Sequence, residues 1–302
     1  MAVKTMQVII NGQTTTLTKN STTGKWEATI TAPATSSYKQ SGHYYGVTVK
    51  ATDEAGNVAT KDASDATLGS KLRLVVKEKV APVITITAPT AGAYLANNTP
   101  EIKFKVTDND SGVNPDTIKI TIDSGAAITS GITKNEVSGG YECTYKPTTA
   151  LADGSHTIKV DANDYDGNAA AQKSVTFKVD TVPPTLSITS PANGLITNKA
   201  ACTVSGTTND VTSSPCTVTV KLNSGAAEAV TVNDDGTFSK ALTLAAGSNT
   251  ITVVATDKAG KQTTVTRTVT LDTTPPSITD VTITPNPVDA GKTFVISVTV
   301  TD

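Results

Sequence analysis

The chain has 302 residues, a formal net charge of −2 and no basic cluster, so neither nucleic acid nor an anionic membrane surface is expected as a partner. No apolar run approaches the roughly 20 residues of a membrane span, so membrane insertion is not expected. With 21 Gly and 14 Pro to form turns and only 4% aromatic residues, the composition favours several small β-domains with thin aliphatic cores.

The chain opens with a strand pattern. Apolar residues alternate along residues 6–10, which is the period of a half-buried strand, and Asn-Gly follows as a turn. The only tryptophan, in GKWEATI at residues 24–30, is interpreted as a core side chain. A second alternating strand leads into ATDEAGN at residues 51–57, and LRLVV at residues 72–76 is expected to close this part of the chain.

Two motifs then repeat. ATDEAGN returns as ANDYDGN at residues 162–168 and as ATDKAGK at residues 255–261. Each closing strand is followed by a proline-containing segment, at residues 77–89, 179–191 and 271–285. Because proline fixes φ and cannot donate to a strand ladder, we expect stiff links between successive domains, which favour a rod.

The repeats predict domain boundaries at residues 1–77, 78–180, 181–273 and 274–302. By alignment, the first range holds strands C to G of a seven-stranded domain, and the last holds strands A and B. Together these two pieces make up one further repeat. We therefore expect one domain to be split between the two ends of the chain.

ATDEAGN and its copies, VDTVPP, LDTTPP and GTFSKALTLAAGSNTITV resemble bacterial immunoglobulin-like (Ig-like) domains of tandem surface proteins and phage structural proteins. The resemblance covers almost the whole chain and implies an all-β fold of tandem Ig-like β-sandwich domains. The opening MAVKTMQVIINGQ carries no export signal and is more similar to Ig-like proteins encoded in phage tail gene clusters of Gram-positive gut bacteria. Such proteins assemble in the host cytoplasm and leave by lysis. Modules of this kind mostly act as spacers or ligand carriers.

We expect a non-enzymatic structural protein of the virion, a tail or fibre component. Its expected partners are copies of itself, other virion proteins and a host cell-surface glycan. The C-terminal strands of one subunit would complete the N-terminal domain of the next by strand addition, giving a ring or a filament. The expected subunit interface consists of Met6, Val8, Ile10, Phe294, Ile296, Val298 and Val300. The alternative is a fragment of a secreted, extracellular adhesin, or of a spacer array in a carbohydrate-active protein.

No catalytic constellation is visible. His43 and His156 fall in equivalent turns of two different domains, and neither zinc-ligand spacing nor a phosphate-binding loop occurs. The cysteines do not suggest a disulfide framework, because Cys202 and Cys216 fall near the starts of consecutive strands, at opposite ends of a sandwich. We therefore expect no enzyme activity and no cofactor other than a metal ion.

Acidic residues recur in the loops between strands B and C and between strands F and G. Both loops lie where the preceding linker enters, so their carboxylates could converge and bind Ca²⁺. The candidate ligands are Asp108, Asp110, Asp164, Asp166, Asp180, Asp210 and Asp257. The simpler and favoured interpretation is that Asp caps turns through its own backbone. Lys261 and Glu78, which replace the Asn and Asp of the other copies, weaken the idea of a uniform metal site.

Tyrosines suggest one further kind of site. Tyr38, Tyr44, Tyr45 and Tyr94 are expected to be exposed and could stack on sugars. The favoured alternative is that Tyr44 or Tyr45 packs against a sandwich corner near strand F.

Overall fold

The computed structural model describes residues 2–302, and apart from two short 3-10 helices its regular structure is β-strand. The predicted all-β fold is confirmed. The chain divides into two compact units. The first ends at Val179 and the second begins at Asp180, and each is described separately below. Nowhere in residues 2–302 is there a helix with the length and apolar character needed to cross a membrane.

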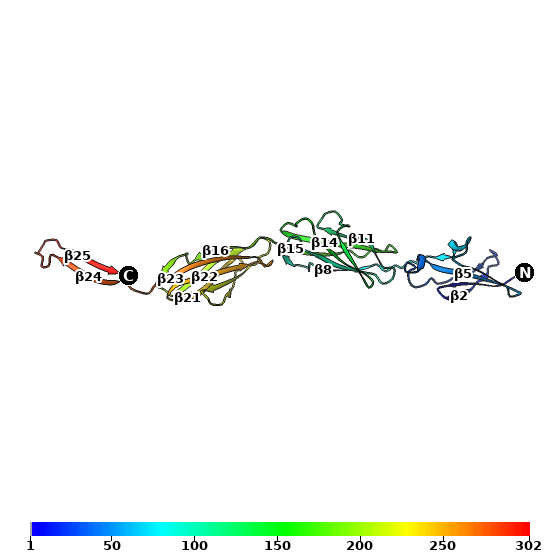
Figure 1. The fold of residues 1–302 in the computed structure, drawn as a ribbon, viewed down its shortest axis with the longest axis horizontal. Helices are drawn as coiled ribbons and strands as arrows, with labels where there is room; N and C mark the ends of the chain where they lie inside the picture. The colour runs from blue at the N-terminus through cyan, green and yellow to red at the C-terminus, as the bar shows by residue number, and fades with distance from the viewer. Residues whose placement is uncertain (1) are drawn as a thin grey trace. The chain divides into compact units, whose positions relative to one another are not determined.

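Residues 78–179 form a two-sheet sandwich. Its strands are β8 (Val83–Ala88), β9 (Tyr94–Leu95), β10 (Ile102–Thr107), β11 (Val113–Ile122), β12 (Thr133–Val137), β13 (Gly140–Tyr145), β14 (Gly154–Asp164) and β15 (Lys173–Val179). One sheet has the order β12-β13-β10-β8 and the other β11-β14-β15-β9. Figure 1 shows β8 on one side of this domain and β14 and β15 on the other. Alternate side chains point inward, so Phe104 of β10 and Ile120 of β11 meet in a fully buried core.

Residues 180–273 repeat this arrangement in the second unit. The strands are β16 (Thr185–Ser190), β17 (Leu195–Thr197), β18 (Ala201–Asn209), β19 (Thr217–Leu222), β20 (Glu228–Val230), β21 (Thr237–Thr243), β22 (Gly247–Thr256) and β23 (Gln262–Leu271). The sheets have the orders β16-β18-β21 and β17-β23-β22-β19-β20. Val204, Phe238 and Val253 lie in a second buried core between them. Both complete domains therefore bury one face of each sheet.

Residues 2–77 have one sheet and only a fragment of a second. The elements are β1 (Val3–Ile10), β2 (Gln13–Thr16), β3 (Thr18–Lys19), β4 (Trp26–Glu27), η1 (Ser41–His43), β5 (Tyr45–Asp53), β6 (Val58–Lys61), η2 (Gly69–Leu72) and β7 (Arg73–Leu74). The sheet has the order β2-β1-β5-β6, with β7 also paired to β5. β3 and β4 pair with each other as a separate two-stranded ribbon.

The closing strand of this part differs from the prediction. The expected strand at residues 72–76 is reduced to β7, and β6 is the strand that pairs with β5 directly after the turn. The reason lies in the segment between them. Asp62 accepts a hydrogen bond from the N–H of Ser64, and Asp65 accepts from Thr67 and Leu68. These side-chain-capped turns take the chain away from the sheet before β7 returns to it.

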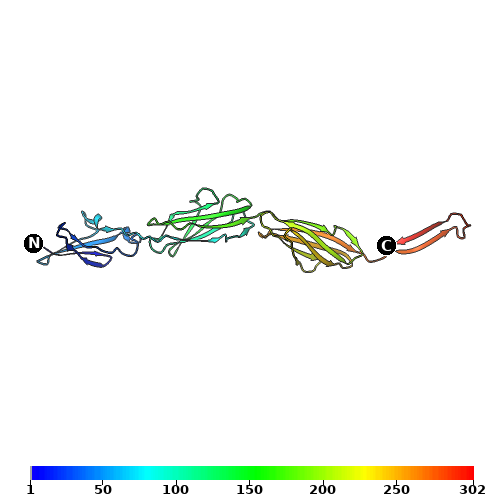
Figure 2. The same cartoon turned by 180° about the vertical axis from the view of Figure 1, so that it is seen from behind.

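The last two strands form a hairpin. β24 (Ser277–Thr284) and β25 (Val295–Thr301) pair antiparallel with each other, and within residues 2–302 they belong to no larger sheet. Figure 2 shows them as a two-stranded ribbon. An isolated hairpin is marginally stable in water, so this element has the character of a sheet that lacks its neighbours.

Candidate functional sites

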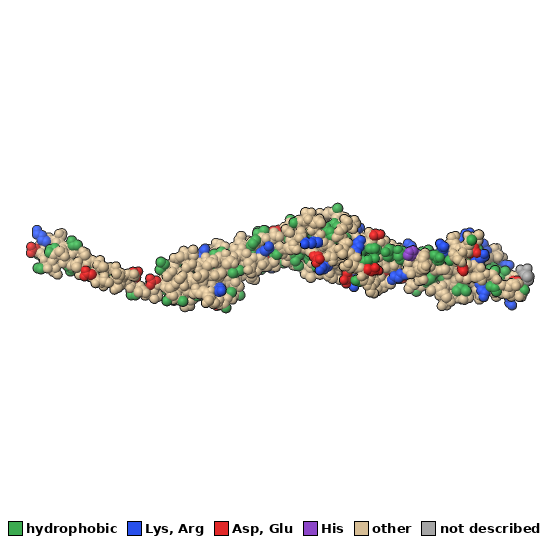
Figure 3. Space-filling model, in the orientation of Figure 1, with side chains coloured by type: hydrophobic (Ala, Val, Ile, Leu, Met, Phe, Trp, Pro, Cys, Tyr) green, Lys and Arg blue, Asp and Glu red, His purple; other side chains and the backbone are tan. Residues whose placement is uncertain are grey.

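The β24–β25 hairpin carries one apolar face. The strand register pairs Ile278 with Val300, Val281 with Val298, and Ile283 with Ile296. Opposite side chains in an antiparallel pair lie on the same face, so all six are together, and each is 43–67% exposed. Hydrophobic side chains are visible on the hairpin surface in Figure 3. The equivalent positions of β8 and β10, Ile84, Phe104 and Val106, are at most 2% exposed. The hairpin therefore has the side chains of a core layer without the layer that should cover them.

The sheet of residues 2–77 also has an apolar face that is only partly buried. Val47, Val49 and Ala51 of β5 are half-buried, whereas the aligned Ile158, Val160 and Ala162 of β14 are 0–1% exposed. A cavity of about 190 Å³ lies beside Val8 and Ile10 of β1, with Ile30 and Pro33 on its wall. The inner face of this sheet is therefore covered only in part by residues of its own domain.

Two strand edges are also unpaired within the described part of the chain. In the complete domain of residues 78–179, β13 pairs with β12 on one edge and with β10 on the other. Its counterpart β4 pairs with β3 alone. In the same domain β10 lies between β8 and β13, whereas its counterpart β25 pairs with β24 alone. The edges left open on β4 and β25 are thus those that pair with each other in the complete domain.

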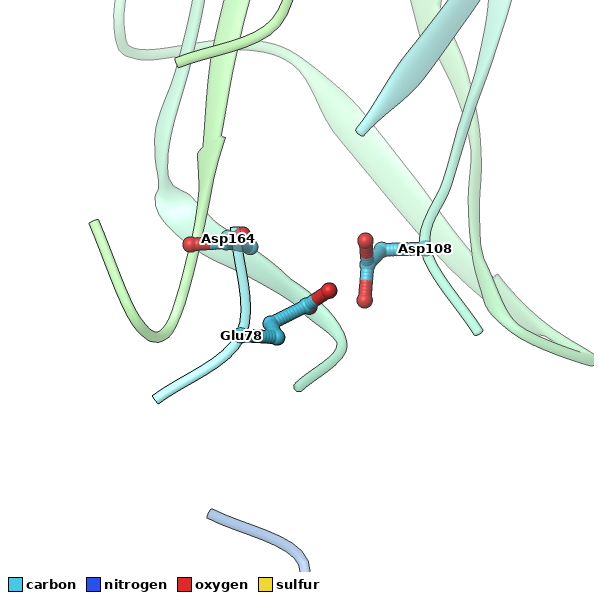
Figure 4. A group of neighbouring side chains, drawn as sticks. All are labelled: Glu78, Asp108 and Asp164. Atoms are coloured by element: carbon cyan, nitrogen blue, oxygen red, sulfur yellow. The ribbon is translucent and has the colours of Figure 1, made fainter. Parts of the chain in front are cut away.

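An acidic cluster lies at one end of the domain of residues 78–179. Carboxylate oxygens of Glu78, Asp108 and Asp164 come within 4.8 Å of one another, and Figure 4 shows the Glu78 and Asp108 side chains facing each other. Glu78 Oε1 accepts hydrogen bonds from the N–H and hydroxyl of Ser111, at 2.9 and 2.8 Å. Asp164 Oδ2 accepts from the Asn168 side-chain amide at 2.6 Å. Donors of the protein therefore already engage much of this cluster.

A second acidic cluster consists of Asp180, Asp210 and Asp257, in the second unit. Their carboxylate oxygens also lie within 4.8 Å of one another, and the three residues are only 1%, 7% and 7% exposed. The hydroxyl of Ser213 donates to Asp180 Oδ2 and to Asp210 Oδ1. Burial raises the pKa of the Asp210 carboxyl, but hydrogen bonds donated by Ser213 and Thr212 outweigh burial, and the net shift of the pKa is downward. This favours an ionised carboxylate in a buried place.

The structure thus brings together five of the seven aspartates proposed from the sequence, in two groups, and adds Glu78. The remaining two serve other contacts. Asp110 Oδ1 accepts the N–H of Ser36 at 2.9 Å, and Asp166 Oδ2 accepts the N–H of Glu78 at 3.0 Å. The sequence missed Glu78 as a cluster member, because a glutamate was taken to disrupt the site. Its aligned position before the first strand of the domain, where the other copies have Asp, was the available signal.

The tyrosine hypothesis needs a correction. Tyr45 is 5% exposed and its hydroxyl bonds the Thr35 side chain at 2.7 Å, so it is not available to stack on a sugar. Tyr38 stacks on Tyr165, with ring centroids 4.0 Å apart. Tyr44 lies under the guanidinium of Arg73, at 4.7 Å from its ring centroid. The structure therefore does not present these rings as one open platform.

The histidines and cysteines do not form a nucleophilic site among the described residues. His156 Nδ1 lies 2.9 Å from Asp123, whereas His43 contacts the Tyr38 carbonyl. All three cysteines are free, and burial raises the pKa of the Cys143 thiol to about 11. A thiol held protonated in this way is unreactive as a nucleophile.

Comparison with family models identifies the type of domain. Residues 88–181 match the model of a bacterial Ig-like domain. The chain carries Ig-like β-sandwich domains in tandem. Residues 184–273 match the model named glucodextranase, domain B. None of the curated protein sequences compared with the chain matches it.

Several solved structures are similar to parts of the chain. The fibronectin(III)-like modules of CbhA from Clostridium thermocellum share 17% identity at a TM-score of 0.39, over 63% of this chain and 94% of theirs. Sidekick-1 immunoglobulin domains 1–4 share 12% identity at a TM-score of 0.35, over 88% of this chain and 67% of theirs. Drosophila N-cadherin EC1-3 shares 15% identity at a TM-score of 0.27, over 88% and 89% of the two chains.

Proposed function

We propose that this protein is a non-enzymatic structural protein whose copies join head-to-tail, with the β24–β25 hairpin of one copy completing the domain of residues 2–77 in the next. The observation that carries the proposal is the match between the two open elements. One is a strand pair with an exposed apolar face, and the other is a sheet whose apolar face is only partly covered. Taken together, the two elements would supply the strands of one Ig-like sandwich.

The complete domain of residues 78–179 supplies the expected strand order. There the sheet runs β12-β13-β10-β8, so a joined sheet would run β3-β4-β25-β24. The register can also be transferred, because β10 pairs Val106 with Tyr141 and Phe104 with Cys143. The repeats align Val300 with Val106 and Trp26 with Tyr141. Val300 would therefore lie opposite Trp26, Val298 opposite Ala28, and Ile296 opposite Ile30.

This pairing would bring Ile296 beside Ile30, which lines the cavity next to Val8 and Ile10. Fully burying an aliphatic side chain contributes about 1.5–3 kcal/mol relative to leaving it exposed, and six such side chains line the hairpin face. The new ladder between β25 and the segment after β4 would satisfy backbone groups at two open edges. Because donor and acceptor surfaces differ, the contact is heterologous and generates a ring or a filament.

The first test is a pair of matched substitutions on β25. Val298→Asp places a charge on the apolar face, whereas Thr299→Asp places it on the opposite face of the same strand. Val298→Asp is expected to convert assemblies into monomers in light scattering at micromolar concentration, and Thr299→Asp to leave them intact. A wild-type chain that stays monomeric, or a Val298→Asp chain that still assembles, overturns the proposal.

A second test addresses the register. A chain carrying both Ala28→Cys and Val298→Cys is expected to form disulfide-linked ladders between chains under oxidation, since facing β-carbons in a strand pair come within bonding range. Ala28→Cys with Thr299→Cys is the control, because the two side chains would point to opposite faces. A disulfide formed only within single chains would show that the hairpin folds back, and would overturn head-to-tail joining.

The resemblance of the sequence motifs to Ig-like proteins of phage tail gene clusters supports a phage particle, as a tail or fibre component, as the setting of this assembly. Other virion proteins and a host glycan would then be the further partners. The match of residues 184–273 to a model named after a glucodextranase favours a second candidate, a spacer array of a carbohydrate-active protein. Sedimentation of the full chain with insoluble glucan tests the second candidate, and a chain that does not sediment with the glucan contradicts it.

A further inference from the structure

The Asp180–Asp210–Asp257 cluster contains a buried oxygen with no partner. Asp257 Oδ2 is inaccessible to solvent and receives no hydrogen bond from the described residues. A buried carboxylate oxygen left in this state is costly, because it has lost its hydration without replacement. The other oxygen of the same group is satisfied, since Asp257 Oδ1 accepts the N–H of Lys261 at 2.9 Å. Asp257 Oδ2 is thus the oxygen of this carboxylate that no donor satisfies.

The two other copies of this turn show how the oxygen is normally satisfied. Asn168 donates its N–H to Asp164 Oδ1 at 2.7 Å and its side-chain amide to Asp164 Oδ2 at 2.6 Å. Asn57 makes the same two bonds to Asp53, at 2.8 and 2.9 Å. In the third copy the aligned residue is Lys261, which keeps the backbone bond and has no amide to offer. The substitution of Asn by Lys therefore frees Oδ2.

The charge of the three carboxylates and the spacing of their oxygens define which ligand fits beside Asp257 Oδ2. Three buried carboxylates within 4.8 Å of one another repel strongly where the dielectric constant is low. Oxygens bound to one Ca²⁺ ion lie about 2.3–2.6 Å from it, and hence at most about 5 Å from one another. The spacing of the cluster matches that limit. Its donor set is carboxylate oxygen, without the nitrogen and sulfur that zinc prefers.

We infer that Asp180, Asp210 and Asp257 bind one Ca²⁺ ion, and that Lys261 makes this site possible by leaving Asp257 Oδ2 free. Asp180 comes from the segment before β16, Asp210 from the loop after β18, and Asp257 from the turn after β22. A cation at this point would tie the three segments together at one end of the domain. The Glu78–Asp108–Asp164 cluster is not expected to bind as well, because among the described residues none of its buried carboxylate oxygens lacks a hydrogen-bond partner.

Calorimetric titration of the chelator-treated full chain with CaCl₂ tests this assignment. The wild type is expected to bind Ca²⁺, and Asp257→Asn to lose that binding by at least about tenfold in affinity, since one ligand charge is removed. Asp164→Asn, in the other cluster, is the matched control and is expected to bind as the wild type does. Loss of binding in Asp164→Asn but not in Asp257→Asn would overturn the assignment.

Lys261→Asn is the sharper variant, because the other two copies show that Asn folds well in this turn. Its amide is expected to occupy Asp257 Oδ2 and to weaken Ca²⁺ binding by about tenfold, without loss of folded structure by circular dichroism. Unchanged affinity in Lys261→Asn would overturn the role given to this residue. Parallel titrations with MgCl₂ and ZnCl₂ decide the metal class. Absence of any Ca²⁺ binding, or a preference for Zn²⁺, would overturn the site and favour carboxylates that share protons.

Discussion

At the scale of residues, one amino-acid difference changes the hydrogen bonding of a turn that occurs three times in this chain. Asp53, Asp164 and Asp257 each accept the N–H of the residue four positions later, so the turn is the same in all three copies. Whether the second carboxylate oxygen is satisfied depends on that residue alone. From the sequence, Lys261 argued against a metal site. The proposed Ca²⁺ site reverses this argument, because an asparagine amide would compete with a cation for the same oxygen.

His156 provides a pH-dependent prediction at this scale. Burial lowers the pKa of the imidazole, but the Ala152 carbonyl and the Asp123 carboxylate outweigh burial, and the net shift of the pKa is upward. The pKa of Asp123 shifts downward, because hydrogen bonds from His156 and Thr157 outweigh its burial. The raised pKa of His156 stabilises the domain at pH below about 6.5, the ordinary histidine pKa, and this contribution disappears as the pH rises through the folded value. The Asp123 contribution is present above about pH 3.9 and is lost on further acidification.

Asp123→Asn is therefore expected to lower the pKa of His156 and to destabilise the domain more at pH 5.5 than at pH 8.5. The measurement is an NMR titration of the His156 ring proton, with urea denaturation at the two pH values. Glu101→Gln, an exposed charge change in the same domain, is the control and should leave the titration unchanged. An unshifted His156 titration in Asp123→Asn would contradict the proposed pairing.

At the scale of elements, corresponding strands of the two complete domains fill their cores with different residues. Val106 of β10 is buried opposite Tyr141 of β13, and the aligned pair in the next domain is Gly206 opposite Phe238. A β-carbon built on Gly206 would lie 2.2 Å from the Ser187 carbonyl oxygen and 2.8 Å from the Phe238 ring. The phenyl ring and the strand β16 have thus taken the space that valine fills in the other copy.

Gly206→Ala is therefore expected to destabilise the domain of residues 180–273 by about 1–3 kcal/mol, the usual cost of overpacking. Hydrogen exchange at the β18 amides of the full chain measures this effect without interference from the other domains. Thr203→Ala, at an exposed position of the same strand, is expected to change the exchange free energy by less than about 0.5 kcal/mol. Equal protection in the two variants would show that the close approach relaxes freely.

At the scale of the whole molecule, the open elements predict which parts depend on assembly. Deleting residues 274–302 is expected to increase hydrogen exchange at residues 26–30 by about tenfold or more at concentrations where the wild type assembles, since β4 would lose its neighbour. β10 and β14 lie in a sandwich that is complete within its own chain, so their protection should not change. If residues 26–30 exchange equally in both chains, the hairpin does not dock there.

Much of this architecture follows from local sequence. Period-two apolar spacing, Asp-x-x-Gly turns and proline segments predict strands and their limits, because each depends on the preferences of neighbouring residues. The repeats extend this to strand order, since copies of one domain share one topology. The strand after ATDEAGN was the exception. Aspartate-capped turns between residues 62 and 68 divide it into β6 and β7, and no other copy contains that segment.

By itself, the sequence determined the all-β fold, the repeats and the apolar alternation of the last two strands. Only the tertiary structure decided which carboxylates converge. Asp108 and Asp110 are two residues apart in the same loop, yet one joins Glu78 and Asp164 while the other bonds Ser36. The unpartnered Asp257 oxygen was likewise invisible until its surroundings were known. Local patterns fix strands because their causes are local, whereas burial and the supply of hydrogen-bond donors depend on segments that are distant in the chain.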